Sequence, residues 1–202
     1  MKKIALTSLL AVFTVSAANA ATNYFVGGNA ALRTNNDHTS VLNVAPEFGW
    51  KVDSKWDLGV AANFGYNHKD TINVPGAGLV DVESYGYGAD VFARYNVAEF
   101  GGVKLLLKGT VGADFNTYHD DDADKTETLS SINASIIPMI TYDISEAFTL
   151  YANLNFLGVN AGYNFKNKDL GVNENTWRFS AVADSDNVAD TGAFQIGFNY
   201  NF

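Results

Sequence analysis

Apolar residues recur at every second position along most of this chain. One stretch alternates Trp56, Leu58, Val60, Ala62, Phe64 and Tyr66 with Asp57, Gly59, Ala61, Asn63, Gly65 and Asn67. Because successive side chains on a strand point to opposite faces, this pattern predicts β-strands that are apolar on one face only. Eight such stretches are present, at residues 24–33, 42–51, 56–67, 85–95, 104–116, 132–142, 148–156 and 194–202. The predicted fold class is therefore all-β.

Two architectures share this alternation: a soluble sandwich with its apolar faces inside, and a transmembrane barrel with its apolar faces toward lipid. The ends of the apolar faces carry aromatic residues, as the interfacial girdles of membrane barrels do. The opposite faces are rich in Gly, Asn and charged residues, which suits a narrow, filled barrel interior. The girdle candidates are Trp50, Trp56, Tyr66, Tyr95, Tyr142 and Phe148.

The lengths of the connections also favour the membrane barrel. Short ones (52–55, 97–102 and 143–147) alternate with long ones (34–40, 68–84, 117–127 and a segment within 158–191). Outer-membrane barrels have short periplasmic turns and longer extracellular loops. We therefore predict a closed antiparallel up-and-down transmembrane β-barrel of eight strands, with both chain ends at the periplasmic side.

Two features qualify the strand assignment. Trp177 to Ala183 also alternates, which fits a hairpin arm above the membrane, the first half of a bulged last strand, or a barrel of ten strands. Pro46 and Pro138 fall inside predicted strands. Proline cannot donate to a ladder, so we expect a bulge or a missing ladder bond at each.

The N-terminus has the pattern of a secretory signal peptide. Lys2 and Lys3 precede an apolar run at residues 4–15, and Ala18-Asn19-Ala20 forms an A-x-A cleavage site. The apolar run is too short for a comfortable membrane anchor. We predict a signal peptide at 1–20 and one barrel domain at 21–202.

Composition excludes several classes of function. The 202 residues include 13 basic and 22 acidic ones, a formal net charge of −9, and removal of Lys2 and Lys3 would leave −11. An acidic chain without a basic block does not suit nucleic-acid binding. The absence of Cys excludes disulfides and zinc–thiolate sites. Mean hydropathy is −0.05, although the chain contains 3 Trp, 10 Tyr and 14 Phe. Strands with one apolar and one polar face explain how a chain rich in aromatic residues can have a mean hydropathy near zero.

Charged residues also fall on the faces predicted to line the barrel interior. An eight-stranded barrel is just wide enough for its own side chains, and a buried charge needs a partner. We expect a structural network in which Asp90 and Arg94 pair with residues of the next strand; the alternative is the filter of a narrow channel. These lumen charges are Arg33, Glu47, Lys51, Asp57, Asp90, Arg94, Lys104, Lys108 and Asp114.

The last strand carries the most specific motif, the alternating series Phe194, Ile196, Phe198, Tyr200 and Phe202. It resembles the C-terminal signal by which outer-membrane proteins are delivered to the barrel-assembly machinery. Residues 46–50 and 87–95 likewise resemble the outer-membrane β-barrel domain family, which includes small OmpA-like and OmpX-like barrels and porin-family barrels. The resemblance covers the mature chain and implies the outer membrane of a Gram-negative bacterium. It also implies contact with lipid and lipopolysaccharide.

Other candidate sites are weak. The acidic run at residues 119–124 could attract divalent cations but lacks the spacing of an EF-hand loop. His38, His68 and His119 fall in predicted loops, and the sequence contains no G-x-S-x-G elbow. We therefore expect no catalytic centre, no metal and no cofactor.

The sequence thus predicts a monomeric outer-membrane barrel with a structural, surface-interaction or adhesion role. Its loops are the place for an extracellular ligand. The alternatives are a narrow porin-like channel for ions or small solutes and, less favoured, a barrel-type hydrolase or acyltransferase.

Overall fold

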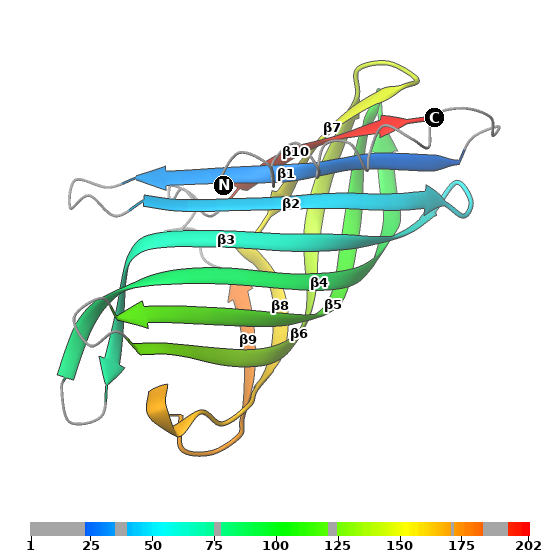
Figure 1. Cartoon of the computed structure of the whole chain (residues 1–202). Helices are drawn as coiled ribbons and strands as arrows, with labels where there is room; N and C mark the ends of the chain where they lie inside the picture. The colour runs from blue at the N-terminus through cyan, green and yellow to red at the C-terminus, as the bar shows by residue number, and fades with distance from the viewer. Residues whose placement is uncertain (1–22, 35–39, 75–77, 121–124, 171, 184–193) are drawn as a thin grey trace.

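A computed structural model of the chain describes residues 23–34, 40–74, 78–120, 125–170, 172–183 and 194–202 (Figure 1). These residues form one ten-stranded antiparallel sheet and a short 3-10 helix, η1 (Lys168–Leu170). None of the described helical residues forms a segment long and apolar enough to cross a membrane. The strands are β1 (Tyr24–Thr34), β2 (Ser40–Lys51), β3 (Trp56–Val74), β4 (Gly78–Phe100), β5 (Val103–Asp120), β6 (Lys125–Asp143), β7 (Phe148–Leu154), β8 (Leu157–Asn164), β9 (Thr176–Ala183) and β10 (Phe194–Asn201).

Eight of these strands close into a barrel. β1 to β7 neighbour one another in chain order, and β10 pairs with β7 on one side and with β1 on the other. The up-and-down eight-stranded barrel predicted from the alternation is therefore confirmed. Closure is what a membrane requires, because an open edge in hydrocarbon would leave backbone N–H and C=O groups unpaired.

The two remaining strands, β8 and β9, form a hairpin that joins the wall beside β6 (Figure 1). β6 pairs with β7 through residues 139–143 and with β8 through residues 131–136. A two-residue turn at Asn155 and Phe156 separates β7 from β8. Both strands run antiparallel to β6, so β8 takes the place of β7 beside β6 in one half of the wall. The hairpin is therefore part of the barrel wall. The strand assignment of Trp177 to Ala183 was left open by the sequence, and residues 184–193, which follow this segment, lie outside the described residues.

The two ends of the barrel differ. The short turns at 52–55, 101–102 and 144–147 lie at one end, which we call the inner end, and the β3–β4 and β5–β6 hairpins lie at the outer end. β3 to β6 contain 19, 23, 18 and 19 residues, whereas a tilted strand crosses a membrane in about 9–11 residues. The prediction of loops at 68–84 and 117–127 was wrong, because most of these residues continue the ladders. These segments lie between the alternating stretches, but cross-strand pairing holds their backbone as strand.

The barrel is apolar outside and polar inside. Large hydrophobic side chains stand exposed on every strand, whereas Glu47, Arg94 and Lys108 are buried. On β4 the apolar exterior runs from Tyr85 to Tyr95, a path of about 33 Å at ~3.3 Å per residue. At the usual tilt of about 40° this gives a band about 25 Å high, the height that outer-membrane barrels expose to lipid.

Local irregularities of the sheet coincide with prolines and glycines of the sequence. The β2–β3 ladder lacks pairs at Ala45 and Pro46, and Pro138 lies where β6 changes its partner from β8 to β7. The prediction at each proline was a bulge or a missing ladder bond. The β4–β5 turn is Gly101-Gly102, with φ of 57° and 88°. Positive φ at both residues is what a type I′ hairpin turn requires.

Candidate functional site in the barrel interior

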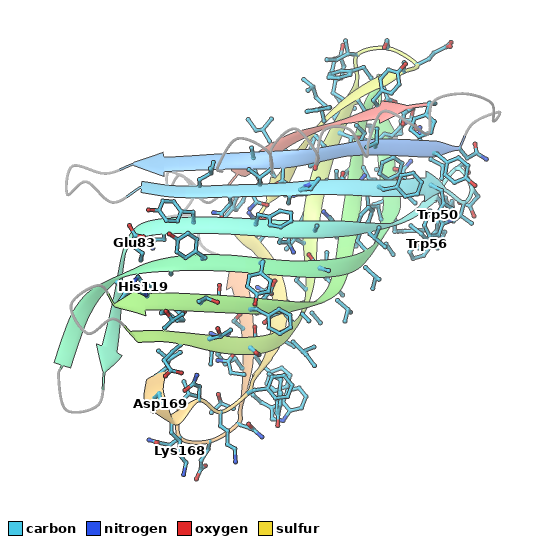
Figure 2. The ribbon with its side chains drawn as sticks, in the orientation of Figure 1. Trp50, Trp56, Glu83, His119, Lys168 and Asp169 are labelled. Carbon is cyan, nitrogen blue, oxygen red and sulfur yellow. The ribbon has the colours of Figure 1, made fainter. Side chains whose placement is uncertain are left out.

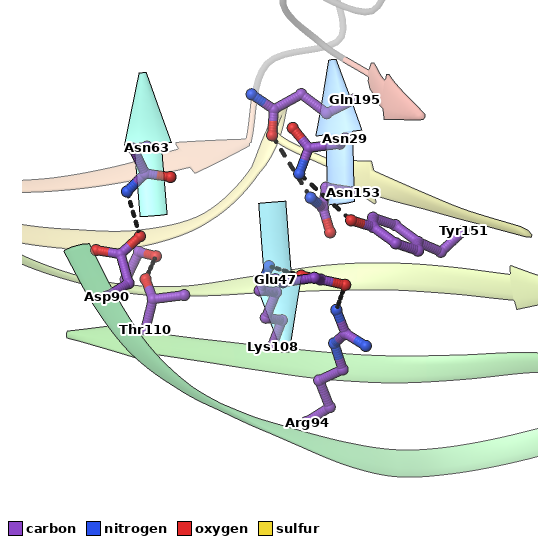
Figure 3. A network of polar contacts seen from close by, with 11 residues as sticks. Asn29, Glu47, Asn63, Asp90, Arg94, Lys108, Thr110, Tyr151, Asn153 and Gln195 are labelled. Atoms are coloured by element: carbon purple, nitrogen blue, oxygen red, sulfur yellow. Dashed lines mark hydrogen bonds and ion pairs between the residues drawn. The ribbon is translucent and has the colours of Figure 1, made fainter. Parts of the chain in front are cut away.

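A buried ion pair crosses the middle of the barrel (Figure 3). Arg94 of β4 donates from Nη2 to Oε1 of Glu47 on β2, and Lys108 Nζ of β5 lies 3.5 Å from Glu47 Oε2. Arg94 and Glu47 are only 1% and 2% exposed. With its amide nitrogen turned toward Glu47, Asn199 of β10 donates to Oε1 at 2.8 Å and accepts from Arg94 Nη1 at 3.0 Å. One carboxylate therefore joins four strands across the lumen.

Three aromatic rings surround the Arg94 guanidinium. Its Cζ lies 5.1, 4.7 and 5.2 Å from the ring centres of Phe25, Phe92 and Tyr151. Lys108 Nζ lies 4.9 Å from the Phe92 ring centre. Cations held over aromatic faces are attracted by the ring quadrupole, most strongly where water is excluded. The rings thus compensate part of the cost of burying these cations.

Each of these rings lies over a glycine of the neighbouring strand. A Cβ on Gly49 would be 2.3 Å from Phe25 Cζ, one on Gly59 would be 2.3 Å from Phe92 Cζ, and one on Gly197 would be 2.4 Å from Tyr151 Cζ. Because glycine has no side chain, it leaves the space in which a ring can lie flat against the wall. The glycines of the inner face are therefore matched to the large side chains opposite them.

These groups, together with Leu106 and Met139, form a layer that closes the lumen, which we call the plug. Leu106, Met139 and Tyr151 are in contact and 5%, 0% and 2% exposed. The plug separates an outer cavity of about 700 Å³ from an inner cavity of about 250 Å³. The polar rows of the strands thus build a partition rather than an open bore.

Side-chain amides are the most frequent polar groups in the lining of the outer cavity. Asn63 Nδ2 donates to Asp90 Oδ2 and Asn133 Nδ2 to Asp114 Oδ2, both at 2.6 Å. Near the plug, Asn29 Nδ2 donates to the Tyr151 hydroxyl at 3.4 Å. Its amide-bearing lining residues are Asn29, Asn43, Asn63, Asn67, Asn116, Asn133, Asn153, Asn155, Asn160 and Gln195.

The inner cavity is lined by charges of both signs. Lys104 Nζ lies 2.7 Å from Asp143 Oδ2, and the Thr149 hydroxyl donates to Asp143 Oδ1 at 2.6 Å. Lys51 and Asp57 also line this cavity. The Lys104–Asp143 pair is about one-third exposed, unlike the ion pair of the plug.

The structure brings the predicted lumen charges together in a different pattern from the one expected. The sequence suggested that Arg94 and Asp90 of β4 pair with Lys104, Lys108 or Asp114 of β5, but Arg94 and Lys108 both meet Glu47 of β2. Like charges such as Arg94 and Lys108, which are directly opposite in the β4–β5 ladder, need a shared anion. Asp90 and Asp114 bond to amides instead. The Arg33 side chain lies outside the described residues.

Sequence reasoning did not identify Phe25, Phe92, Tyr151 and Asn199 as parts of this site. The alternation already placed these residues on inward faces. A large ring among Gly and Asn residues was the feature that could have marked Phe25, Phe92 and Tyr151 as parts of the site. Which strand each side chain faces across the lumen depends on the tilt and closure of the barrel.

The predicted girdle residues lie at two levels. Trp50, Trp56, Tyr95, Tyr142 and Phe148 lie next to the inner-end turns, and the rings of Trp56 and Tyr95 are 4.8 Å apart. Tyr66 lies at the outer end of the apolar band, 5.1 Å from Tyr85. Figure 2 shows Trp50 and Trp56 at one end of the barrel and Glu83 and His119 toward the other.

Beyond Tyr66 and Tyr85, polar side chains stand on the exterior of β4, β5 and β6 where the structure describes them. The Tyr66 and Tyr85 hydroxyls donate to Glu83 at 3.1 and 3.0 Å, and His119 Nδ1 lies 3.0 Å from the Thr126 hydroxyl. His68 and His119 therefore lie on strands rather than in loops as predicted, and His38 lies outside the described residues. Most of the acidic run 119–124 is also outside them. Among the described residues, no three His, Cys, Asp or Glu side chains are arranged to hold a metal ion.

The C-terminal strand completes the barrel. Ile196, Phe198 and Tyr200 are 66%, 49% and 46% exposed on its outer face. The Phe198 ring stacks 5.6 Å from Phe148, and Phe202 lies 6.5 Å from Tyr24. Phe194 pairs with Leu154 through its backbone. Ile196, Phe198 and Tyr200 therefore face outward, and the ring contacts link the C-terminal segment to β7 on one side and to β1 on the other.

A closed eight-stranded barrel with an apolar, aromatic-bounded exterior and a polar, plugged interior defines the class of small outer-membrane β-barrels. Among solved structures, the chain is similar to Neisserial surface protein A, at 14% identity over 91% of this chain and 98% of that one, with a TM-score of 0.50. It is also similar to a major outer membrane protein from Thermus thermophilus (14% identity, 91% and 100% covered, TM-score 0.48) and to Ail of Yersinia pestis (11% identity, 90% and 97% covered, TM-score 0.38). No family model and no curated protein matches the sequence. These likenesses concern the fold.

Proposed function

We propose that this protein is a non-conducting barrel of the bacterial outer membrane that stabilises the envelope and presents surface at its outer end. The observation that carries the proposal is the plug. Phe25, Arg94 and Met139 are each at most 1% exposed at its level. A permeating ion would have to displace a buried ion pair and leave its charges without partners, so it would face a high barrier.

The outer end supports the presenting role. β3 to β6 continue beyond the apolar band as paired strands, and the described exterior side chains of β4 to β6 there include Glu83, His119 and Thr128. Recognition sites are commonly carried on connections that a rigid scaffold positions. Neisserial surface protein A, which shares this fold, is described as a surface protein.

The remaining assignments follow from this role. Export would use residues 1–20 as a signal peptide, and insertion by the barrel-assembly machinery would use the outward aromatic series of β10. Lipid and lipopolysaccharide would surround the exterior of a monomer in the outer membrane of a Gram-negative bacterium. An extracellular ligand would meet the outer hairpins.

Planar-bilayer recording of the purified protein tests the closed lumen. The wild-type protein is expected to give no stable conductance steps, because the plug separates its two cavities. A Phe92→Ala/Arg94→Ala variant is expected to give them, whereas Lys104→Ala, which alters only the inner cavity, is not. Stable steps from the wild-type protein would overturn the closed lumen.

That result would favour the second candidate, a narrow channel for ions or small solutes. One observation speaks for it: water-accessible cavities reach the plug from both ends of the barrel, so displacement of a single layer would join them.

We propose no catalytic activity. His119 has a hydroxyl partner in Thr126 on the outer exterior, so the sharpest assay follows release of fatty acid from phospholipid or lipopolysaccharide by the wild-type protein and His119→Ala. The expected rates equal those of empty micelles. Turnover that disappears in His119→Ala would contradict the proposal and favour the hydrolase alternative.

A further inference from the structure

The outer cavity has the dimensions of a binding site for a small molecule. Its volume of about 700 Å³ lies within the range of about 300–1,000 Å³ that ligand sites occupy. The ion pair of Glu47 and Lys108 forms its floor, and its lining extends outward to Asn67, Ser84 and Asn116. The cavity therefore leads from the plug toward the outer end of the barrel.

Two carboxylates lie side by side on one wall of this cavity. Asp90 of β4 lies over Gly112 of β5, and Asp114 of β5 lies over Gly88 of β4. One oxygen of each accepts from an asparagine amide. Within the part of the chain that the structure describes, neither carboxylate has a cation within salt-bridge distance. Of the described cations that line the cavity, Lys108 pairs with Glu47, and Arg178 of β9 donates to Asn164 Oδ1 at 3.1 Å.

A further acceptor without a partner lies on another wall. Asn153 of β7 is 2% exposed and lines the same cavity. Its Nδ2 donates to Gln195 Oε1 at 3.5 Å, while its Oδ1 has no hydrogen-bond partner among the described residues. Figure 3 shows this oxygen directed away from Gln195, toward the level of Glu47. A buried polar atom without a partner is rare and costs free energy, so it calls for a donor.

We propose that the outer cavity binds a small organic cation with two or more amino groups, the polyamine class, through Asp90 and Asp114 at one end and Asn153 Oδ1 at the other. All three groups accept hydrogen bonds, and two carry negative charge, so the ligand must supply donors and positive charge. β7 is three strands away from β4 around the barrel, and a ligand with amino groups at both ends can reach both walls. A neutral sugar would leave the carboxylates unneutralised, and a metal ion cannot span the walls.

The charge of the whole chain favours the same ligand. The formal net charge of the chain is −9. A net negative charge raises the local concentration of cations and speeds their association, and salt weakens this effect. Binding is therefore expected to be tightest at low ionic strength.

Calorimetric titration of the purified protein in detergent micelles with spermidine tests this proposal. Saturable binding at one site is expected. Asp90→Asn/Asp114→Asn should lower the affinity at least tenfold, and Asn153→Leu should lower it about threefold. Asn153→Asp, which adds negative charge at the other end of the site, should raise it, an outcome that a purely structural role for Asn153 would not produce.

The matched control is Asp169→Asn, which removes one exposed acidic charge on η1 outside the cavity and should leave spermidine binding unchanged. Heat-modifiable mobility in SDS gels shows that each variant is folded before titration. Trehalose or Mg²⁺ at equal concentration should not displace spermidine. The proposal is overturned by absence of saturable binding, by unchanged affinity in the folded double Asp variant, by an equal loss in Asp169→Asn, or by displacement by either competitor.

Discussion

At the scale of single residues, Glu47 is the residue on which the plug depends most. It lies opposite Ala61 of β3, which in turn lies opposite Asp90 of β4. The small Ala61 side chain leaves room above β3, so Glu47 can reach cations on β4 and β5. An acidic residue in an apolar-looking segment thereby holds two cations that would otherwise repel each other inside the barrel.

Glu47→Gln should lower the free energy of unfolding by about 3–5 kcal/mol, because it leaves Arg94 and Lys108 buried without an anion. Urea-induced unfolding in lipid vesicles, followed by tryptophan fluorescence, measures this loss. Asp143→Asn is the matched control: its pair with Lys104 is about one-third exposed, and such pairs contribute about 0–1 kcal/mol. Equal losses in the two variants would contradict the central role of the buried pair.

At the scale of the elements, the strands are matched to one another through their inward faces. Phe92 of β4 covers Gly59 of β3, and Phe25 of β1 covers Gly49 of β2. A glycine would weaken an isolated strand. Here each glycine stabilises the pairing of its strand with the neighbouring one, because it accommodates the neighbouring ring.

Gly59→Ala should lower the free energy of unfolding by about 1–3 kcal/mol, the usual cost of overpacking. Its Cβ would be 2.3 Å from Phe92 Cζ and 2.5 Å from the Phe48 carbonyl oxygen. Gly109→Ala makes the same change where the nearest atom is 3.9 Å away, and it should be tolerated. If urea unfolding showed equal stability for both variants, the ring would not need the glycine.

The outer ends of the strands are a second feature at this scale. The lack of Cys in the chain allows single cysteines to report which end is exposed at the cell surface. Glu174→Cys, between η1 and β9, should react with a membrane-impermeant maleimide on intact cells, and Ser54→Cys, in the β2–β3 turn, should react only after lysis. The reverse pattern would place the short turns at the cell surface and invert the orientation of the barrel.

At the scale of the whole molecule, the usual distribution of residues is reversed. Val91 is 59% exposed at the middle of the apolar band, whereas Arg94, further along β4, is 1% exposed. In water such an apolar exterior would favour aggregation. In a bilayer the same exterior matches the surrounding hydrocarbon.

Val91→Arg should destabilise the barrel in lipid vesicles by about 2–4 kcal/mol, because a charge on the lipid face near the membrane midplane is costly. Thr128→Arg, on the polar exterior beyond the band, should change the stability by less than about 0.5 kcal/mol, as surface substitutions usually do. Urea titration of both variants measures the difference. A Val91→Arg protein as stable as the wild type would contradict burial of this face in lipid.

The site was less predictable than the wall. Alternation placed Glu47, Arg94 and Lys108 inside, because the direction of a side chain on a strand is a local property. Their actual pairing was not predictable, because Glu47 and Arg94 belong to strands that are not neighbours. The outer ends of β3 and β4 were missed for a related reason: their pairing depends on the partner strand and not on the turn-forming residues that each contains.

The sequence by itself determined the eight alternating strand segments, their apolar and polar faces and the closed barrel, since these follow from a period of two and from the cost of unpaired backbone in lipid. Only the tertiary structure decided which inward side chains meet across the lumen. That outcome depends on the tilt and stagger of the closed wall. These bring Glu47, Arg94 and Lys108 together as a plug and leave Asp90 and Asp114 on the wall of a cavity.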